Sequence, residues 1–265
     1  MKLTKIFALA AAAALTLTAA SCGAKTKKIE SVDDLAGAKI GVQLGTTGDI
    51  YVSGDVESGV FPGATVEPYN KGVDAIQALK VGKIDAVVID SEPAKAFVAA
   101  NKELAILDAA YAEEEYAICI AKDNADLTAA FNGAIAELKA DGTMDLIFDK
   151  YINKTEGAEG YVTPDGTAYP NGQLVMATNA YFEPYEYYDG EEIVGYDAEF
   201  AKAICDKLGY ELVIEDMEFD SIIAAVQSGK ADFGAAGMTV TEDRLQSIDF
   251  TDSYANAVQV IVYKK

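Results

Sequence analysis

The sequence predicts an α/β protein of two lobes that face each other across a cleft. Residues 29–107 and residues from 174 onward each alternate short apolar strands with helices, the pattern of βαβ units. A short internal match links the two series: residues 78–86 and 225–233 both read as a helix end, a Gly-Lys stop and a strand that opens with aspartate. Any two αβ units look partly alike, but these two strands also lead to polar residues of complementary chemistry.

The first thirty residues read as a targeting segment. Lys2 and Lys5 precede an apolar run, residues 6–17, too short to span a bilayer but suited to the core of a secretory signal. Small residues then lead to Cys22 in a stretch that resembles the lipobox of bacterial lipoproteins, with alanine where leucine is usual. We expect a signal peptide over 1–21, a lipid on Cys22 and a tether over 22–30. The alternative is a plain secreted protein cleaved near Ala20.

Residues 31–111 are expected to form one α/β lobe. The lobe begins with a short capped helix, a strand over 39–43 and a Gly/Thr turn. The N–H groups and hydroxyls of such a turn can bind an anion, although most Gly/Thr turns bind nothing. A strand at 66–69 and a helix at 72–81 follow. The near-continuous apolar run 84–90 is typical of a parallel strand buried on both faces, and it ends on Asp90, where ligands of open α/β sheets bind.

Residues 112–152 are assigned to the other lobe as a strand, 116–121, and two helices, 125–140 and 144–152. Residues 153–173 lack periodicity and are rich in Gly, Pro and Thr, which indicates a linker on the surface.

Residues 174–265 are assigned to the main part of that lobe. A strand at 174–178, an aromatic loop at 179–188, a helix at 196–208, a strand at 211–214 and a helix at 221–226 precede the strand 231–236. That strand leads to Arg244, the only arginine in the chain. Arg244 lies in the first turn of a helix that Thr241, a good N-cap, is expected to begin. The helix dipole disfavours a cation in that turn, so the presence of an arginine there needs an explanation. One explanation is that Arg244 binds an anion, because the fork of a guanidinium group matches the two oxygens of a carboxylate. The alternative is that Arg244 is a surface residue that pairs with Asp243 or Asp249.

Together these residues suit a free α-amino acid, which needs a fork donor and an anion facing each other. The carboxylate has donors in Arg244, Thr239 and the N–H groups of Thr46 and Thr47. The ammonium has acceptors in Asp90, the Gly237 carbonyl and the Thr239 hydroxyl. The flat faces of Phe182 and Phe219 suit the ligand side chain.

Composition excludes several other functions. A formal net charge of −22 makes the chain a poor nucleic-acid binder, and the absence of histidine nearly excludes a zinc site or a serine–histidine triad. Cys119 and Cys205 form a disulfide or remain two separate buried thiols. We expect no metal, no cofactor and no catalytic residue.

Five motifs carry a resemblance that covers nearly all of the chain after residue 30. Residues 177–185 read A-T-N-A-Y-F-E-P-Y, and residues 194–204 read V-G-Y-D-A-E-F-A-K-A-I. Residues 235–254 begin with A-A-G-M-T-V-T-E-D-R and end with I-D-F-T-D-S-Y. Residues 31–47 and 138–151 read S-V-D-D-L-A-G-A-K-I-G-V-Q-L-G-T-T and L-K-A-D-G-T-M-D-L-I-F-D-K-Y. The chain thus resembles the solute-binding family 3, the amino-acid-binding proteins of bacterial ABC importers.

The resemblance implies a type II periplasmic-binding-protein-like fold with the ligand in the cleft between lobes. It adds Ala236, Asn179 and Gln43 to the site. In that family the segment like 174–265 comes first, so this chain looks circularly permuted, with 153–173 joining the usual ends. We expect one covalent crossing between lobes to remain, near residues 109–115, and hence a looser hinge.

The resemblance also implies a function. We expect a monomer at the cell surface or in the periplasm that closes on an amino acid and delivers it to a membrane permease. Asn179 and Gln43 stand where binders of cationic amino acids often have an acid, so a neutral side chain is expected. One alternative is a dehydratase-like enzyme, for which Asp90 and Glu183 are the candidate acid–base groups; another is a ligand-sensing adaptor for a receptor.

Overall fold

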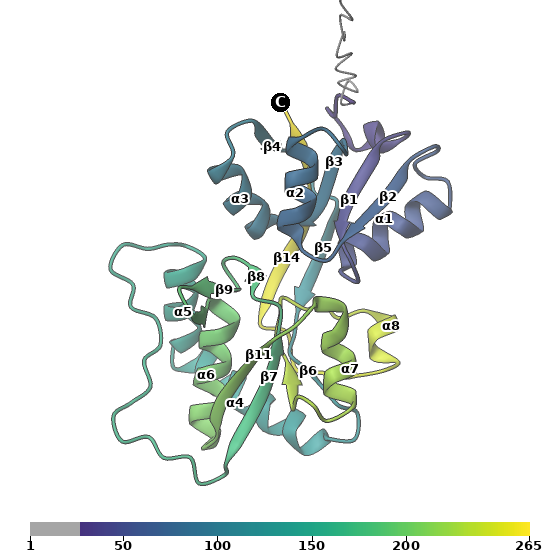
Figure 1. Cartoon of the computed structure of the whole chain (residues 1–265). Coiled ribbons are helices and arrows are strands. Elements are labelled where there is room, and N and C mark those ends of the chain that lie inside the picture. Colours follow the sequence, from purple (N-terminus) through teal and green to yellow (C-terminus); the bar gives the residue numbers. More distant parts are fainter. Residues whose placement is uncertain (1–26) are drawn as a thin grey trace, which may run out of the picture.

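The computed structural model describes residues 27–265. The expected signal peptide, the lipid on Cys22 and most of the tether therefore lie outside the described residues. The expected two-lobe α/β fold is confirmed: the two larger sheets, each covered by helices, lie one above the other in Figure 1. Among residues 27–265 the helices lack the length and apolar character that a bilayer span requires.

The upper lobe in Figure 1, here called lobe 2, is built on a sheet with the strand order β2-β1-β3-β14-β4, in which β14 is the C-terminal strand Ala255–Lys264. Strands β1, β2 and β3 are parallel, and β14 runs antiparallel beside β3. All five residues of β3 are buried, as its apolar run predicts. Two apolar clusters fill the lobe, one around Ile40 and Val42 and one around Ile76 and Leu79. Its elements are η1 (Val32–Leu35), β1 (Lys39–Gln43), α1 (Thr47–Glu57), β2 (Thr65–Tyr69), α2 (Gly72–Lys80), β3 (Ala86–Asp90), α3 (Ser91–Ala100) and β4 (Leu104–Ile106).

The lower lobe, lobe 1, has the strand order β11-β7-β12-β6-β13 and a separate small sheet, β10-β9-β8. Aromatic rings dominate its core, with Tyr196 stacked on Tyr254 at 5.8 Å between ring centroids. Its elements are β6 (Cys119–Ile120), α4 (Ala125–Ala140), α5 (Thr143–Tyr151), β7 (Gln173–Thr178), β8 (Tyr181–Phe182), β9 (Glu186–Asp189), β10 (Glu192–Val194), α6 (Tyr196–Leu208), β11 (Glu211–Asp216), η2 (Phe219–Ser221), α7 (Ile222–Gln227), β12 (Phe233–Gly234), α8 (Glu242–Leu245) and β13 (Asp249–Phe250).

The two lobes repeat one topology. In each, three parallel strands (β2-β1-β3 and β11-β7-β12) are followed by one antiparallel strand, β14 or β6. The strand predicted at 231–236 is shorter than expected, because only Phe233 and Gly234 pair before the chain leaves the sheet toward the cleft. The strand predicted at 116–121 is likewise interrupted, since β5 (Ala112–Tyr116) ends before β6 begins.

Two strands cross between the lobes, β5 and β14 (Ala255–Lys264), and they pair with each other from Ala255 with Tyr116 to Gln259 with Ala112. β14 then continues along β3 as far as Tyr263. Placing all of 174–265 in lobe 1 is therefore wrong, because the apolar end of β14 is buried between β3 and β4 of lobe 2. The expectation of a single covalent crossing is wrong as well. The looser hinge was expected because only one crossing would remain, so that expectation no longer has support.

The segment 153–173 has no helix, and Gln173 begins β7. It is nevertheless attached to α6 at two acidic side chains. Glu199 accepts hydrogen bonds from Lys150 Nζ (2.6 Å), Tyr151 Oη (2.8 Å) and the N–H of Tyr161. Asp206 accepts hydrogen bonds from the hydroxyls of Tyr161 (3.0 Å), Thr163 (2.7 Å) and Tyr169 (3.1 Å).

Candidate ligand-binding site

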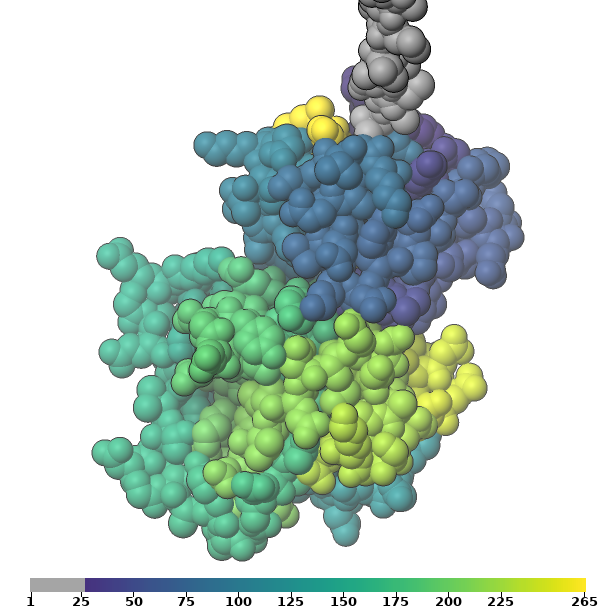
Figure 2. Space-filling model, in the orientation of Figure 1, coloured from purple at the N-terminus to yellow at the C-terminus, as the bar shows by residue number. Residues whose placement is uncertain are grey.

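A narrow cavity of about 10 Å³, room for about one water molecule, lies between the two lobes. Figure 2 shows the two lobes in contact with each other. The structure brings every sequence-predicted site residue to its wall, together with one that was not predicted, Glu186. The lining residues are Gln43, Thr46, Thr47, Asp90, Asn179, Phe182, Glu186, Phe219, Ala236, Gly237, Thr239 and Arg244.

Arg244 lies inside the molecule, 7% exposed, and not on its surface. Thr241 caps α8 by accepting a hydrogen bond from the Arg244 N–H (3.2 Å). The Arg244 side chain points inward. Its Nη1 donates to the Thr239 carbonyl (2.7 Å) and its Nη2 to the Gly45 carbonyl of the other lobe (2.9 Å). Within residues 27–265 no carboxylate forms an ion pair with it. A guanidinium has five N–H donors, so three remain for a ligand anion.

The N-terminus of α1 adds further donors beside Arg244. Thr46 is its N-cap, and the first N–H groups of an α-helix have no partner within the helix. Thr47, which is buried, lies with its hydroxyl 3.5 Å from that of Thr239 in the opposite lobe. An anion between these groups therefore meets a guanidinium and a helix N-terminus at once.

Asp90 provides the negative group of the cavity. It is the last residue of β3, buried, and it accepts a hydrogen bond from the Tyr116 hydroxyl. Burial, followed by repulsion from Glu114, raises the pKa of Asp90 to about 7. A ligand ammonium would favour its ionised form, because an opposite charge in a buried site offsets the cost of desolvation.

Behind Asp90 lies a polar network that the sequence argument missed. Glu114 accepts hydrogen bonds from the Thr239 hydroxyl (3.1 Å) and from Gln259 Nε2 (3.0 Å). The acidic run in β5 was visible in the sequence. Its alternating burial, with Glu113 and Glu115 exposed and Glu114 buried, follows only from the pairing of β5 with β14.

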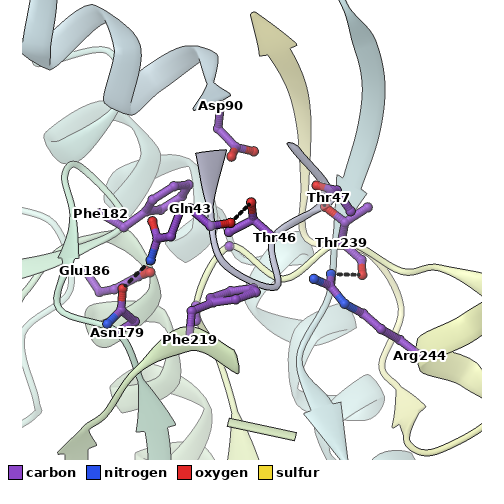
Figure 3. Close-up of a pocket in the computed structure, with 12 residues that line it drawn as sticks. Gln43, Thr46, Thr47, Asp90, Asn179, Phe182, Glu186, Phe219, Thr239 and Arg244 are labelled. Carbon is purple, nitrogen blue, oxygen red and sulfur yellow. Dashed lines mark hydrogen bonds between the residues drawn. The ribbon is translucent and has the colours of Figure 1, made fainter. Parts of the chain in front are cut away.

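Figure 3 shows the end of the cavity away from Arg244, where Phe182 lies beside Gln43, and Phe219 lies between this end and Arg244. Gln43 Nε2 donates to Asn179 Oδ1 across the lobes (2.9 Å), and Asn179 Nδ2 donates to the Met217 carbonyl (2.8 Å). Glu186 lies beside this pair and is fully buried. Its place in the aromatic loop gave no sign that it lines the cavity.

Gly237 shapes the floor of the cavity. Its φ is +54°, and a Cβ atom there would lie 2.7 Å from the ring of Phe182, so only glycine fits. The Gly237 N–H donates to Asp197 Oδ2 of α6 (2.7 Å), which also accepts from the Tyr254 hydroxyl (2.7 Å). Burial raises the pKa of Asp197 to about 6, and these two donors hold the loop in place.

Of the two acid–base candidates for the alternative enzyme, Asp90 lines the cavity and Glu183 does not. Glu183 is half exposed, pairs with Lys154 and does not line the cavity. Cys119 and Cys205 are free buried thiols, so of the two alternatives the unpaired state is confirmed. Burial raises the pKa of each thiol to about 12, which makes them poor nucleophiles. Within residues 27–265, no group of acidic or cysteine side chains is placed to hold a metal ion.

Comparison with known proteins gives a partial match. Residues 174–265 match the family model described as bacterial extracellular solute-binding proteins, family 3. The arginine-binding extracellular protein ArtP of Bacillus subtilis is 45% identical over 93 residues, 35% of this chain and 36% of that protein. The L-cystine-binding protein TcyJ of Escherichia coli is 36% identical over 125 residues, 47% of this chain and 45% of that protein. The chain thus spans less than half of these curated relatives.

Solved structures match over a similar extent. An ancestral arginine-binding protein bound to arginine is 46% identical, with a TM-score of 0.30, over 31% of this chain and 36% of that one. Domain 1 from TmArgBP in its arginine-bound form is 35% identical, with a TM-score of 0.31, over 36% of this chain and 81% of that one.

Proposed function

Because residues 174–265 match the family model of the bacterial extracellular solute-binding proteins, family 3, we propose that this chain binds a free α-amino acid between its two lobes. One observation carries the proposal. One cavity has on its wall a guanidinium, Arg244, that forms no ion pair among residues 27–265, and a buried carboxyl group, Asp90, and the two come from different lobes. A molecule that bears one carboxylate and one ammonium on the same carbon satisfies both.

In the proposed complex the ligand carboxylate lies between the remaining donors of Arg244 and the N-terminus of α1. The ligand ammonium lies against Asp90, with the Gly237 carbonyl and the Thr239 hydroxyl as further acceptors. The ligand thereby joins the lobes at the positions where Arg244 already bonds Gly45 and Gln43 already bonds Asn179. Binding would therefore favour the closed form.

The identity of the side chain is less constrained. The relatives are named for arginine, cystine and histidine. The amide groups of Gln43 and Asn179 suit the neutral side chain expected from the sequence, whereas Glu186 suits a cation.

Delivery to a permease, a lipid on Cys22, a monomeric state and the circularly permuted order of the lobes are parts of the same proposal. The internal order supports the last of these, since the segment that matches the family model follows lobe 2 in the chain. A sensing adaptor would use the same cavity and remains the second candidate. Co-purification with a membrane permease or with a receptor separates the two.

The test is a thermal-shift and calorimetric screen of the common α-amino acids. A ligand at a hundred times its dissociation constant stabilises the folded state by about 2.7 kcal/mol through mass action. Arg244→Ala should abolish this shift, because the ligand carboxylate then lies buried without its cation. Lys230→Ala, which removes an exposed lysine of the same lobe, is the matched control and should bind normally. Binding by Arg244→Ala within tenfold of the wild type would show that the site is wrong.

A further inference from the structure

Lys71 and Tyr181 make a contact between the lobes outside the cavity. Lys71 is the N-cap of α2 in lobe 2, and its Nζ lies 3.5 Å from the centre of the Tyr181 ring, which belongs to β8 of lobe 1. A cation over the face of an aromatic ring is attracted to it within about 6 Å. Four other contacts of this kind lie among residues 27–265, at 4.8 to 5.4 Å, and none of them joins the two lobes. The Lys71–Tyr181 contact is thus both the shortest of the five and the one that breaks when the lobes separate.

The Tyr181 ring is held in place by its own lobe. It packs against Tyr188 at 6.0 Å between ring centroids, and the Tyr188 hydroxyl donates to Asp216 Oδ2 (3.2 Å). Asp216 Oδ1 accepts the N–H of Ala180, the residue before Tyr181 (2.9 Å). The charges of Asp216 and Glu218 also attract the lysine ammonium group. The positive side chain from lobe 2 therefore meets a supported ring in a negative environment.

The contact lies beside the Gln43–Asn179 hydrogen bond but outside the cavity. Tyr181 follows Asn179 by two residues, and its N–H donates to the Asn179 carbonyl (2.7 Å). In the other lobe Gly72, the residue after Lys71, lies against Gln43, because a Cβ atom there would be 3.5 Å from Gln43 Oε1. Neither Lys71 nor Tyr181 lines the cavity, and Tyr181 is 38% exposed. A ligand in the cavity is therefore separated from both side chains by the amide pair.

We propose that Lys71 and Tyr181 form a clasp that holds the lobes closed and slows the release of the bound amino acid. The cavity has room for about one water molecule, so an amino acid enters or leaves it only when the lobes separate. Separation moves the ammonium group out of reach of the ring, so the attraction stabilises the closed form alone. The flexible stem of the lysine lets the contact follow small changes in the spacing of the lobes. This inference rests on the proposed function and adds a control of release from the same site.

The first test needs no ligand. Spin labels on Ala99→Cys, near the end of α3, and Asp189→Cys, at the end of β9, report the distance between the lobes by double electron–electron resonance. The two native thiols, Cys119 and Cys205, are buried and should stay unlabelled. Lys71→Ala should lower the ratio of closed to open molecules about two- to fivefold, the range for an exposed contact between a cation and a ring. Lys71→Arg keeps a cation and should keep the ratio of the wild type.

Lys83→Ala is the matched control. Lys83 Nζ lies 5.3 Å from the centre of the Tyr69 ring, so this change removes the same charge and the same kind of contact within lobe 2 alone. It should leave the ratio of closed to open molecules unchanged. Tyr181→Leu should reproduce the effect of Lys71→Ala, and the two changes together should add little to either one, because both remove the same contact.

The second test measures release by stopped flow. The chain has 15 tyrosines and no tryptophan, so tyrosine fluorescence follows the opening of the lobes. L-arginine and L-glutamine are the probes, because their side chains differ in charge. Lys71→Ala should speed the release of each probe that binds by the same factor, about two- to fivefold, since the clasp touches no part of the ligand. A side chain that contacts the ligand would instead change the two rates unequally.

Three results would overturn the inference. The first is an equal ratio of closed to open molecules in the wild type and in Lys71→Ala, and the second is an equal loss in Lys83→Ala. The third is a release rate that Lys71→Ala leaves unchanged, or changes unequally for the two probes. Failure of every α-amino acid to bind would overturn the proposed function instead, and the spin-label distances would still decide whether the clasp holds the lobes closed.

Discussion

Two aspartates show how single residues build the lobes. The Asp85 N–H donates to the Lys39 carbonyl (2.8 Å), and its carboxylate accepts the Lys39 N–H (2.9 Å). Asp232 makes the same pair of bonds with Val175, at 2.8 and 2.7 Å. Each aspartate thus joins the start of its strand to the neighbouring strand, which gives the internal match in the sequence its physical reason.

Asp90 is the residue whose ionisation should govern binding. Its pKa of about 7 in the empty cavity lies above that of a free aspartate, so the proton is bound below pH 7 and lost above it. A ligand ammonium needs the ionised form. We expect the affinity for a neutral amino acid to fall about tenfold per pH unit below pH 7 and to level off above it.

Calorimetric titrations between pH 5 and 8 measure this dependence. Asp90→Asn should bind more weakly at pH 8 and show a flat profile over the same range. A wild-type affinity that does not change from pH 5 to pH 8 would rule out Asp90 as the ammonium acceptor.

At the scale of elements, helix α6 does more than cover the sheet of lobe 1. Asp197 in its first turn holds the Gly237 loop, while Glu199 and Asp206 hold the linker. Gly160 permits this attachment: its φ is +74°, and a Cβ atom there would lie 2.1 Å from the Glu199 carboxylate. One helix therefore connects the floor of the cavity to the segment that joins α5 to β7.

Removing the Glu199 carboxylate should free the linker. Glu199→Ala deletes the acceptor for Lys150, Tyr151 and Tyr161, and hydrogen bonds to a charged group contribute about 1.5–3 kcal/mol each, less where water competes. We expect the protein to stay folded while amides of residues 153–172 exchange faster with deuterium. Glu156→Ala, an exposed change in the linker itself, is the control. Unchanged protection of the linker in Glu199→Ala would contradict the role given to this carboxylate.

The hinge is a pair of antiparallel strands. β5 carries the chain from lobe 2 to lobe 1 and β14 carries it back, and the two are hydrogen-bonded along the crossing. Both also bear site residues, since Glu114 lies on β5 and Gln259 on β14. A bend of these strands would therefore move the polar network behind Asp90 together with the lobes.

In the molecule as a whole, the first and the last described residues both lie on lobe 2. Lys27, the first described residue, donates its N–H to Asp85 (2.8 Å), and the Lys265 N–H donates to the Glu103 carbonyl (2.9 Å). Figure 1 shows both at the end of lobe 2 that points away from lobe 1. Ile29 and Tyr263 contribute to the same apolar cluster.

This geometry makes the proposed permutation testable. A reordered chain, residues 174–265 followed by a short Gly/Ser linker and residues 27–152, keeps both lobes, both crossing strands and every cavity residue. Because the contacts of the lobes do not depend on which surface connection is open, we expect it to fold and to bind the ligand within about threefold of the original affinity. Circular dichroism and calorimetry check the two expectations.

A reordered chain that folds but binds more than tenfold more weakly would show that the present order is needed for function. One that fails to fold would show that the linker, residues 153–173, is part of the folding unit.

The sequence by itself determined the α/β class, the two lobes and the side chains that meet in the cleft. Strand period, helix stops and the chemistry of a lone arginine are local properties, and the carboxyl ends of parallel strands lie at one edge whatever the details of packing. Only the tertiary structure decided that β14 belongs to the sheet of lobe 2, that Glu114 points inward, and that Glu186 is buried at the cavity wall. These depend on strand register and on how closely the lobes approach. An acidic side chain looks the same in sequence whether water or another carboxyl group surrounds it.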